Sequence, residues 1–290
     1  MQNILFLGST SQFAGWDVKH VNTYNKFYKG YSAFDLERER ERIRDLKQRD
    51  LPKVNLHTFK GMAIMDEVFP RGDSTVPLAV KPKYQVRQVD KFYASMKNAK
   101  EKVCLLVIGT NDFKSFLVRN NKKLKAGGSF KGKWDNLSLS QKIKFSAKTH
   151  RLVSRTVLDH MKDQIDKFVD KVKVVSEECK FDVILLSSLL ERNYDRVGYE
   201  HLDFWFAHLN YLLCKALKKL DMSVCNANGK FITWKFVNVS EQYFLAQARN
   251  NVASLYRRKE RKSGEMTHRN IHAYRELINM YMEEVHKYVK

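Results

Sequence analysis

Five short apolar segments are spaced along the chain, and longer segments with a helical distribution of apolar and charged residues lie between most of them. Segments this short and this apolar are typical of buried strands. Strands that alternate with helices form a parallel sheet with helices on both faces. The sequence therefore predicts an α/β fold: a three-layer α/β/α sandwich around a mostly parallel, flavodoxin-like five-stranded sheet, in a single domain over residues 1–290. The expected strands are 3–7, 53–57, 103–108, 181–186 and 231–238.

Helices are expected where apolar and charged residues recur at helical spacing, over 34–49, 88–100, much of 140–177, 200–220 and 271–288. A short helical stretch is also expected from Met62. Two connecting segments differ in composition. Residues 69–86 contain three of the four prolines and are expected to form a loop, and residues 119–136 are basic and contain glycine, which indicates a mobile insertion.

A glycine follows each of the first three expected strands: Gly8, Gly61 and Gly109. In an open parallel sheet, ligands bind beyond the carboxyl ends of the strands, where the strand order reverses. Glycine allows the chain to turn sharply there and exposes backbone N–H groups, which can stabilise an oxyanion. The three glycines therefore predict a binding or catalytic site at the carboxyl edge of the sheet.

Four blocks of sequence, in this order, resemble those of the SGNH (GDSL-type) hydrolases. They are Ile-Leu-Phe-Leu-Gly-Ser-Thr at 4–10, Phe-Lys-Gly-Met-Ala-Ile-Met-Asp at 59–66, Gly-Thr-Asn-Asp at 109–112 and Glu-Met-Thr-His at 265–268. Residues 183–192 and 255–258 also resemble the esterase domains of some retrotransposon proteins. The resemblance extends over positions 3–277, and the order of the blocks is more specific than any block alone.

The resemblance implies a role for each matching residue. Asn111 and the Gly61 N–H would stabilise the oxyanion, and His268 would act as the general base. Glu265 would orient the imidazole of His268, at a position where the family usually has aspartate. The alternatives are structural: Asn111 and Asp112 as a turn that caps the next helix, and His268 as an exposed histidine in a basic loop.

The nucleophile position departs from the family pattern. When Gly8 is aligned with the family glycine, Ser9 stands where the family has aspartate and Thr10 stands where it has serine. Threonine is β-branched and stiff, so its methyl group would crowd the attacking geometry. Ser9 or Ser11 could replace it only if the turn shifted register. The literal Gly-Asp-Ser-Thr at 72–75 follows no strand and is interpreted as a surface turn. The sequence thus predicts an ester or acetyl hydrolase fold with weak or no activity.

The charge supports a different function. Lysine and arginine number 53 against 32 acidic residues, a net charge of +21, which favours polyanionic partners such as nucleic acid. The alternative prediction is a basic nucleic-acid-binding or assembly module on a catalytically silent SGNH scaffold. The cluster at 257–262 could instead act as a nuclear localisation signal. The candidate nucleic-acid-binding residues are Lys122, Lys123, Lys125, Lys131, Lys133, Trp134, Arg257 and Arg258.

No metal or cofactor is predicted. The four cysteines show no CxxC pair, and His201 and His208 lie in an aromatic-rich segment that suits packing better than metal binding. We expect all four thiols to be reduced, and therefore an intracellular protein, cytoplasmic or nuclear rather than secreted. The N-terminus lacks the features of a signal peptide, and no apolar segment is long enough to span a membrane.

Overall fold

The structure is a computed structural model of the chain. It describes residues 3–9, 54–59, 62–65, 81–124, 151–189, 202–239 and 271–289, together with a few isolated positions between them. The expected helix at 34–49 and the tetrapeptide at 72–75 lie outside these continuous ranges.

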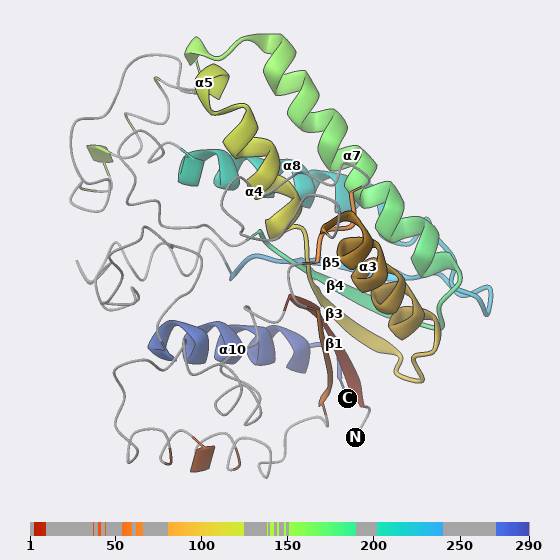
Figure 1. The fold of residues 1–290 in the computed structure, drawn as a ribbon. Coiled ribbons are helices and arrows are strands. Elements are labelled where there is room, and N and C mark those ends of the chain that lie inside the picture. Colours follow the sequence, from red (N-terminus) through yellow and green to blue (C-terminus); the bar gives the residue numbers. More distant parts are fainter. Residues whose placement is uncertain are drawn as a thin grey trace.

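A five-stranded sheet forms the centre of the fold, and all of its strands are parallel (Figure 1). The strand order is β2-β1-β3-β4-β5, which is the flavodoxin-like order. This confirms the predicted fold class, and every strand end lies within two residues of its expected position. The strands are β1 Ile4–Ser9, β2 Val54–Phe59, β3 Val103–Val107, β4 Val183–Ser187 and β5 Thr233–Val237.

Helices cover both faces of this sheet and give the three layers (Figure 1). One face carries α3, α4, α5, α7 and α8, whereas α10 crosses the opposite face. Their bounds are α3 Lys81–Lys97, α4 Thr110–Arg119, α5 Asn121–Leu124, α7 Arg155–Glu177, α8 Leu202–Leu220 and α10 Ile271–His286. Among the described residues, no helix combines the length and the apolar character needed to cross a membrane.

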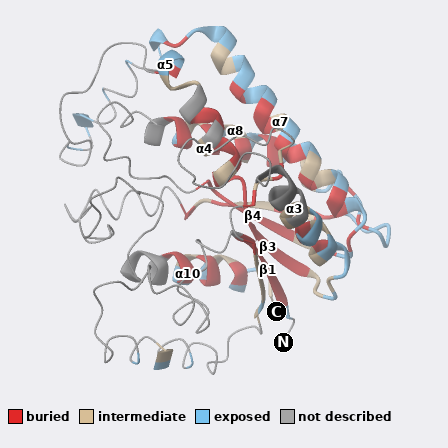
Figure 2. Cartoon of the chain, viewed as in Figure 1, coloured by how far each residue is buried: buried red, intermediate tan, exposed pale blue. Residues whose placement is uncertain are grey.

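The two sides of the sheet have separate apolar cores. Leu5 and Leu7 of β1 belong to the larger core, whereas Ile4 and Phe6 point to the smaller one beneath α10. This division follows from the alternation of side chains along a strand. All five residues of β3 are buried because both of its faces are covered. Figure 2 shows buried residues along the strands and on the helix surfaces that face them.

Several segments differ from their predicted structure. Residues 62–65 are not helical, because the backbone N–H groups of Ile64 and Met65 bind a side chain rather than a preceding turn. Helix α3 begins at Lys81, so the last part of the expected loop at 69–86 is helical. The long helix expected over much of 140–177 is interrupted at Ser154, which has an extended backbone and precedes α7.

The basic segment at 119–136 begins as ordered helix rather than as an insertion. Residues 121–124 form α5, and the Leu124 side chain is completely buried. The indole N–H of Trp205 in α8 donates a hydrogen bond of 3.3 Å to the Leu124 carbonyl oxygen. A single leucine at the end of the turn therefore anchors α5 to the core.

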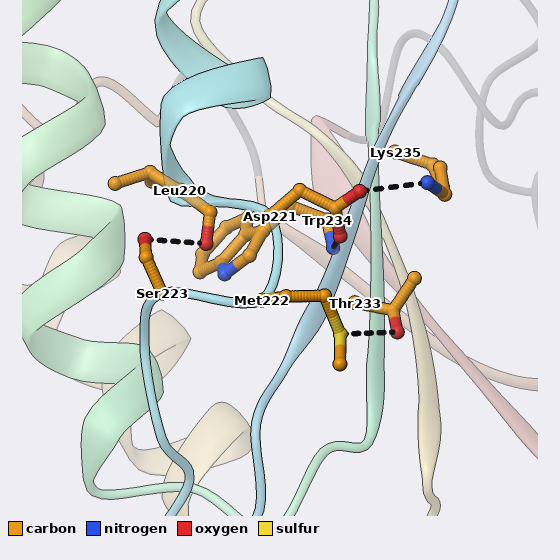
Figure 3. A network of polar contacts seen from close by, with 7 residues as sticks. All are labelled: Leu220, Asp221, Met222, Ser223, Thr233, Trp234 and Lys235. Carbon is orange, nitrogen blue, oxygen red and sulfur yellow. Dashed lines mark hydrogen bonds and ion pairs between the residues drawn. The ribbon is translucent and has the colours of Figure 1, made fainter.

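The turn between α8 and β5 contains a strained residue (Figure 3). Asp221 accepts hydrogen bonds from the Trp234 N–H, at 3.1 Å, and from the Lys235 ammonium, at 2.8 Å. The next residue, Met222, has a φ of 57°. This left-handed conformation is common just after a helix, but a side chain with a Cβ makes it unfavourable.

Replacing Met222 with glycine is expected to stabilise the protein. The Met222 side chain is 58% exposed, so its removal costs little packing, and glycine relieves the strain. We expect Met222→Gly to raise the free energy of unfolding by about 0.5–1 kcal/mol in urea titrations. Met222→Ala is the matched control, since it removes the side chain but keeps the Cβ. Equal effects of the two substitutions would contradict the strain argument.

Candidate active site at the carboxyl edge of the sheet

The carboxyl ends of three strands lie at the same level of the sheet. Gly8 of β1 is paired with Val107 of β3, and the following residue, Ser9, is paired with Phe59 of β2. The connection after β1 leads to β2 on one side, whereas the connection after β3 leads to β4 on the other, and ligands bind at this point in such sheets. The sheet therefore has a switch point at the edge where the site is predicted, although Gly8 lies inside β1 and not in the turn after it.

Gly109 forms the turn from β3 into α4. Its φ is +92°, and a Cβ at this position would lie 2.8 Å from side-chain atoms of both Leu189 and Phe168. Its carbonyl oxygen accepts the first hydrogen bond of the helix from the Phe113 N–H, at 3.0 Å. A glycine is therefore required both by the backbone conformation and by the space around it.

The turn after β4 supports this corner. Asn210 of α8 binds both backbone groups of Leu189: it accepts from the N–H at 2.6 Å and donates to the carbonyl oxygen at 2.9 Å. Leu189 in turn lies against Gly109. This contact was not predicted from the sequence, because Asn210 lies in a helix among apolar residues.

Asn111 and Asp112 in the first turn of α4 hold the segment that follows β2. The Asn111 amide donates to the Met62 carbonyl oxygen at 3.0 Å. The Oδ1 atom of Asp112 accepts from the backbone N–H groups of Ile64, at 2.7 Å, and Met65, at 2.8 Å. Blocks separated by almost 50 residues in the sequence are thus joined beside the end of β1.

These contacts bear on the two interpretations of Asn111 and Asp112. Asp112 lies in the first turn of α4, which is consistent with a structural role at the start of the helix. The hydrogen bonds to residues 62–65 are not helix-capping contacts, because they join α4 to a segment almost 50 positions away in the sequence. The hydrogen bond to the Met62 carbonyl oxygen orients the Asn111 side chain. The oxyanion role of Asn111 stays a prediction.

Asp112 is the only residue of the described part of this site whose pKa is strongly shifted. The carboxyl group is almost completely buried, and burial raises its pKa from 3.8 to about 7. The N–H groups of Met65 and Ile64 and the charge of Lys171 in α7 oppose this shift, since they favour the ionised form. The site thus contains a carboxyl group that changes its charge near neutral pH.

Helix α10 reaches the same edge of the sheet from the other face. The hydroxyl of Tyr281, which is fully buried, forms a 2.9 Å hydrogen bond with that of Ser187, the last residue of β4. Tyr288, which follows α10, packs against the smaller core, whose members include Ile4 at the amino end of β1. Ile271 begins α10 about 15 Å along the helix from Tyr281, on the side of the carboxyl edge.

The structure describes only part of the predicted site. Ser9 ends β1, and Asn111 lies in α4 beside Met62. The remaining predicted catalytic residues, Thr10, Gly61, Glu265 and His268, lie outside the described residues, although Gly61 immediately precedes Met62 and His268 is three positions before Ile271. Their roles stay predictions.

The predicted nucleic-acid-binding residues are described only at α5, where Lys122 and Lys123 are exposed. The others lie outside the described residues: Lys125, Lys131, Lys133, Trp134, Arg257 and Arg258. His208 makes an edge contact with Trp205 and stacks on Tyr211. His201 is not described.

The two buried cysteines are not reactive nucleophiles. Cys104 and Cys179 are buried, and burial raises the pKa of both thiols, that of Cys179 to about 12. A thiol with such a pKa stays protonated and unreactive at neutral pH. All four cysteines are free thiols, and the described residues contain no cluster of potential metal ligands.

A scan against protein-family models found no match to this chain, and a search of curated proteins found no similar sequence.

Replacing Gly109 with alanine is expected to destabilise the protein strongly. The strained φ costs about 1–3 kcal/mol, and the contacts of the new Cβ with Leu189 and Phe168 cost about 1–3 kcal/mol more. Gly229→Ala is the control, since Gly229 has a φ of +74° but no atom within 4 Å of a built Cβ. Urea unfolding should show a clearly larger loss for Gly109→Ala. Equal losses would mean that the corner can rearrange.

Asp112 is expected to make stability fall as the pH rises. Between pH 4 and 7 the folded protein retains a proton that the unfolded chain releases, so this contribution is complete below pH 4 and lost as the pH passes 7. A difference of about three pKa units corresponds to roughly 4 kcal/mol. Asp112→Asn cannot ionise and should lack this component when unfolding is measured from pH 4 to 8. Identical pH dependence in the two proteins would show that Asp112 does not titrate in this range.

Proposed function

We propose that this chain is an ester or acetyl hydrolase of the SGNH type whose turnover is low because Thr10 occupies the nucleophile position. The observation that carries the proposal is the joining of residues 62–65 to Asn111 and Asp112, beside the end of β1. Three of the four sequence blocks that resemble the family thereby have a member at one edge of the sheet. The fourth block, 265–268, is supported by the position of α10. This helix begins on the side of the carboxyl edge, and His268 precedes its first residue by three positions.

In the proposed reaction, His268 takes the proton of the Thr10 hydroxyl as the oxygen attacks the carbonyl carbon of the ester. The Asn111 amide and the Gly61 N–H stabilise the negative charge that develops on the carbonyl oxygen. The protonated His268 then gives its proton to the leaving alcohol, and water hydrolyses the acyl intermediate in a second round of the same steps. Glu265 stabilises the imidazolium between these steps.

The charge of the chain favours anionic substrates. A net charge of +21 raises the local concentration of negatively charged molecules. Phospholipids and acylated or acetylated polyanions carry both the ester and the negative charge. We therefore propose that the natural substrate is an ester on an anionic molecule.

Thr10→Ser is expected to raise activity. Removing the methyl group frees the hydroxyl to approach the carbonyl carbon, and a misplacement of about 1 Å can cost 10²-fold in rate. We expect kcat/KM for nitrophenyl acetate to rise about tenfold or more in Thr10→Ser, and to fall by about 10²–10⁴-fold when His268→Ala is added. The control is His286→Ala, an exposed histidine at the far end of α10, which should leave activity unchanged.

Two results would contradict the proposal. Absence of activity in both the natural protein and Thr10→Ser would exclude an esterase site, and salt-sensitive binding of single-stranded nucleic acid by the same protein would then favour the basic binding module. Activity that survives Thr10→Ala but is lost in Ser9→Ala or Ser11→Ala would move the nucleophile to another hydroxyl of this turn.

A further inference from the structure

We propose that Asp112 is a positioning residue of this site, which sets the place of the Gly61 oxyanion donor by holding the backbone that follows it. The inference rests on the proposed function and extends it. Asn111 is the residue of this block that the family resemblance makes catalytic, whereas Asp112 would act through the backbone of residues 62–65.

The contact has the geometry of a clamp. One carboxylate oxygen, Oδ1, accepts both N–H groups, at 2.7 and 2.8 Å, and the Asp112 side chain is shielded from water. The side chains of Met62 and Ile64 are buried on the same segment. Gly61 immediately precedes Met62 in the chain, so holding residues 62–65 limits the positions that its backbone can take.

The helical turn that carries Asp112 is itself held in place. Asp112 lies in the first turn of α4, and that turn begins at Gly109, which is enclosed by Phe168 and Leu189. A donor that must meet a developing negative charge needs a supporting shell that does not move. The path from Phe168 and Leu189 through α4 to residues 62–65 is such a shell.

The strength of the clamp depends on the charge of Asp112. Hydrogen bonds to an ionised carboxylate are roughly twice as strong as those to a neutral group. Residues 62–65 and the adjoining Ile108–Gly109 carry no ionisable side chain, and from α7 the charge of Lys171 favours ionisation of Asp112. The pKa of Asp112, about 7, places the change between the weaker and the stronger clamp near neutral pH.

Two substitutions of Asp112 separate the clamp from its charge. Asp112→Ala removes both hydrogen bonds, whereas Asp112→Asn keeps an Oδ1 acceptor and cannot ionise. The control is Asp221→Asn, because Asp221 also accepts a backbone N–H and binds Lys235 but lies in the α8–β5 turn. All three are made in the full chain carrying Thr10→Ser, which raises the activity available for measurement.

The experiment measures kcat and KM for nitrophenyl acetate, and hydrogen exchange of the Ile64 and Met65 amides, from pH 5.5 to 8.5. We expect Asp112→Ala to lower kcat about 10²-fold, with KM changed less than threefold, and to abolish exchange protection of the two amides. Asp112→Asn should retain protection and most of kcat, and its pH–rate profile should contain one titrating group fewer near neutral pH, with only that of the general base remaining. Asp221→Asn should change none of these quantities.

The outcomes distinguish the two proposals. Unchanged kcat in a folded Asp112→Ala overturns the positioning role alone, as does loss of kcat in Asp112→Asn with both amides still protected. If Asp112→Ala does not fold, the pH–rate profile and the exchange data of Asp112→Asn decide whether Asp112 has the positioning role. Absence of activity in every Thr10→Ser protein overturns the proposed function and the positioning role with it, while exchange still reports whether Asp112 holds residues 62–65.

Discussion

The burial of β1 and β3 on both faces is the constraint on which the rest of the structure depends. Leu5 and Leu7 fill one core, and Ile4 and Phe6 fill the other. A strand buried on both sides cannot place functional groups on its faces, so chemistry is confined to the point where the strand ends. The register of Gly8 and Ser9 with Val107 and Phe59 brings three such ends to one level. The candidate site is thus a consequence of how the core is packed.

The corners at this edge are held by polar contacts within a largely apolar interior. Asn210 fixes Leu189, Leu189 packs on Gly109, and Gly109 begins the helix that carries Asp112. Buried polar groups are costly unless they are satisfied, and here each one binds a backbone group of a neighbouring corner. The loops after β2, β3 and β4 therefore form one connected unit rather than three independent turns. Such a unit can hold hydrogen-bond donors in place without support from the substrate.

The sequence predicted the strands well, because each is a short apolar run set between segments of helical pattern. It also predicted that Gly61, Asn111 and the end of the first strand would meet, although only Met62, the neighbour of Gly61, is described there. The hydrogen bonds from Ile64 and Met65 to Asp112 could not be predicted, since they join residues almost 50 positions apart and depend on a close approach that no local pattern encodes. The helical start at 121–124 was missed for a related reason. Leu124 stabilises it by its burial in the core and by accepting the hydrogen bond from Trp205, whereas its basic neighbours suggested a loop. Local composition indicates which segments can be strands, and tertiary contacts decide how the polar segments between them are ordered.

Aspartate at position 112 is informative because a neutral residue there would destabilise the folded protein less. Asparagine offers the same acceptor oxygen to Ile64 and Met65 without the cost of burying a charge, whereas aspartate lowers stability as the pH passes 7. Groups that are costly to the fold and titrate near neutral pH occur most often at functional sites. What aspartate adds is a stronger hold on the backbone when it is ionised. That hold matters where the direction of an N–H group is used in chemistry, and residues 62–65 follow directly on the glycine to which the resemblance gives that use.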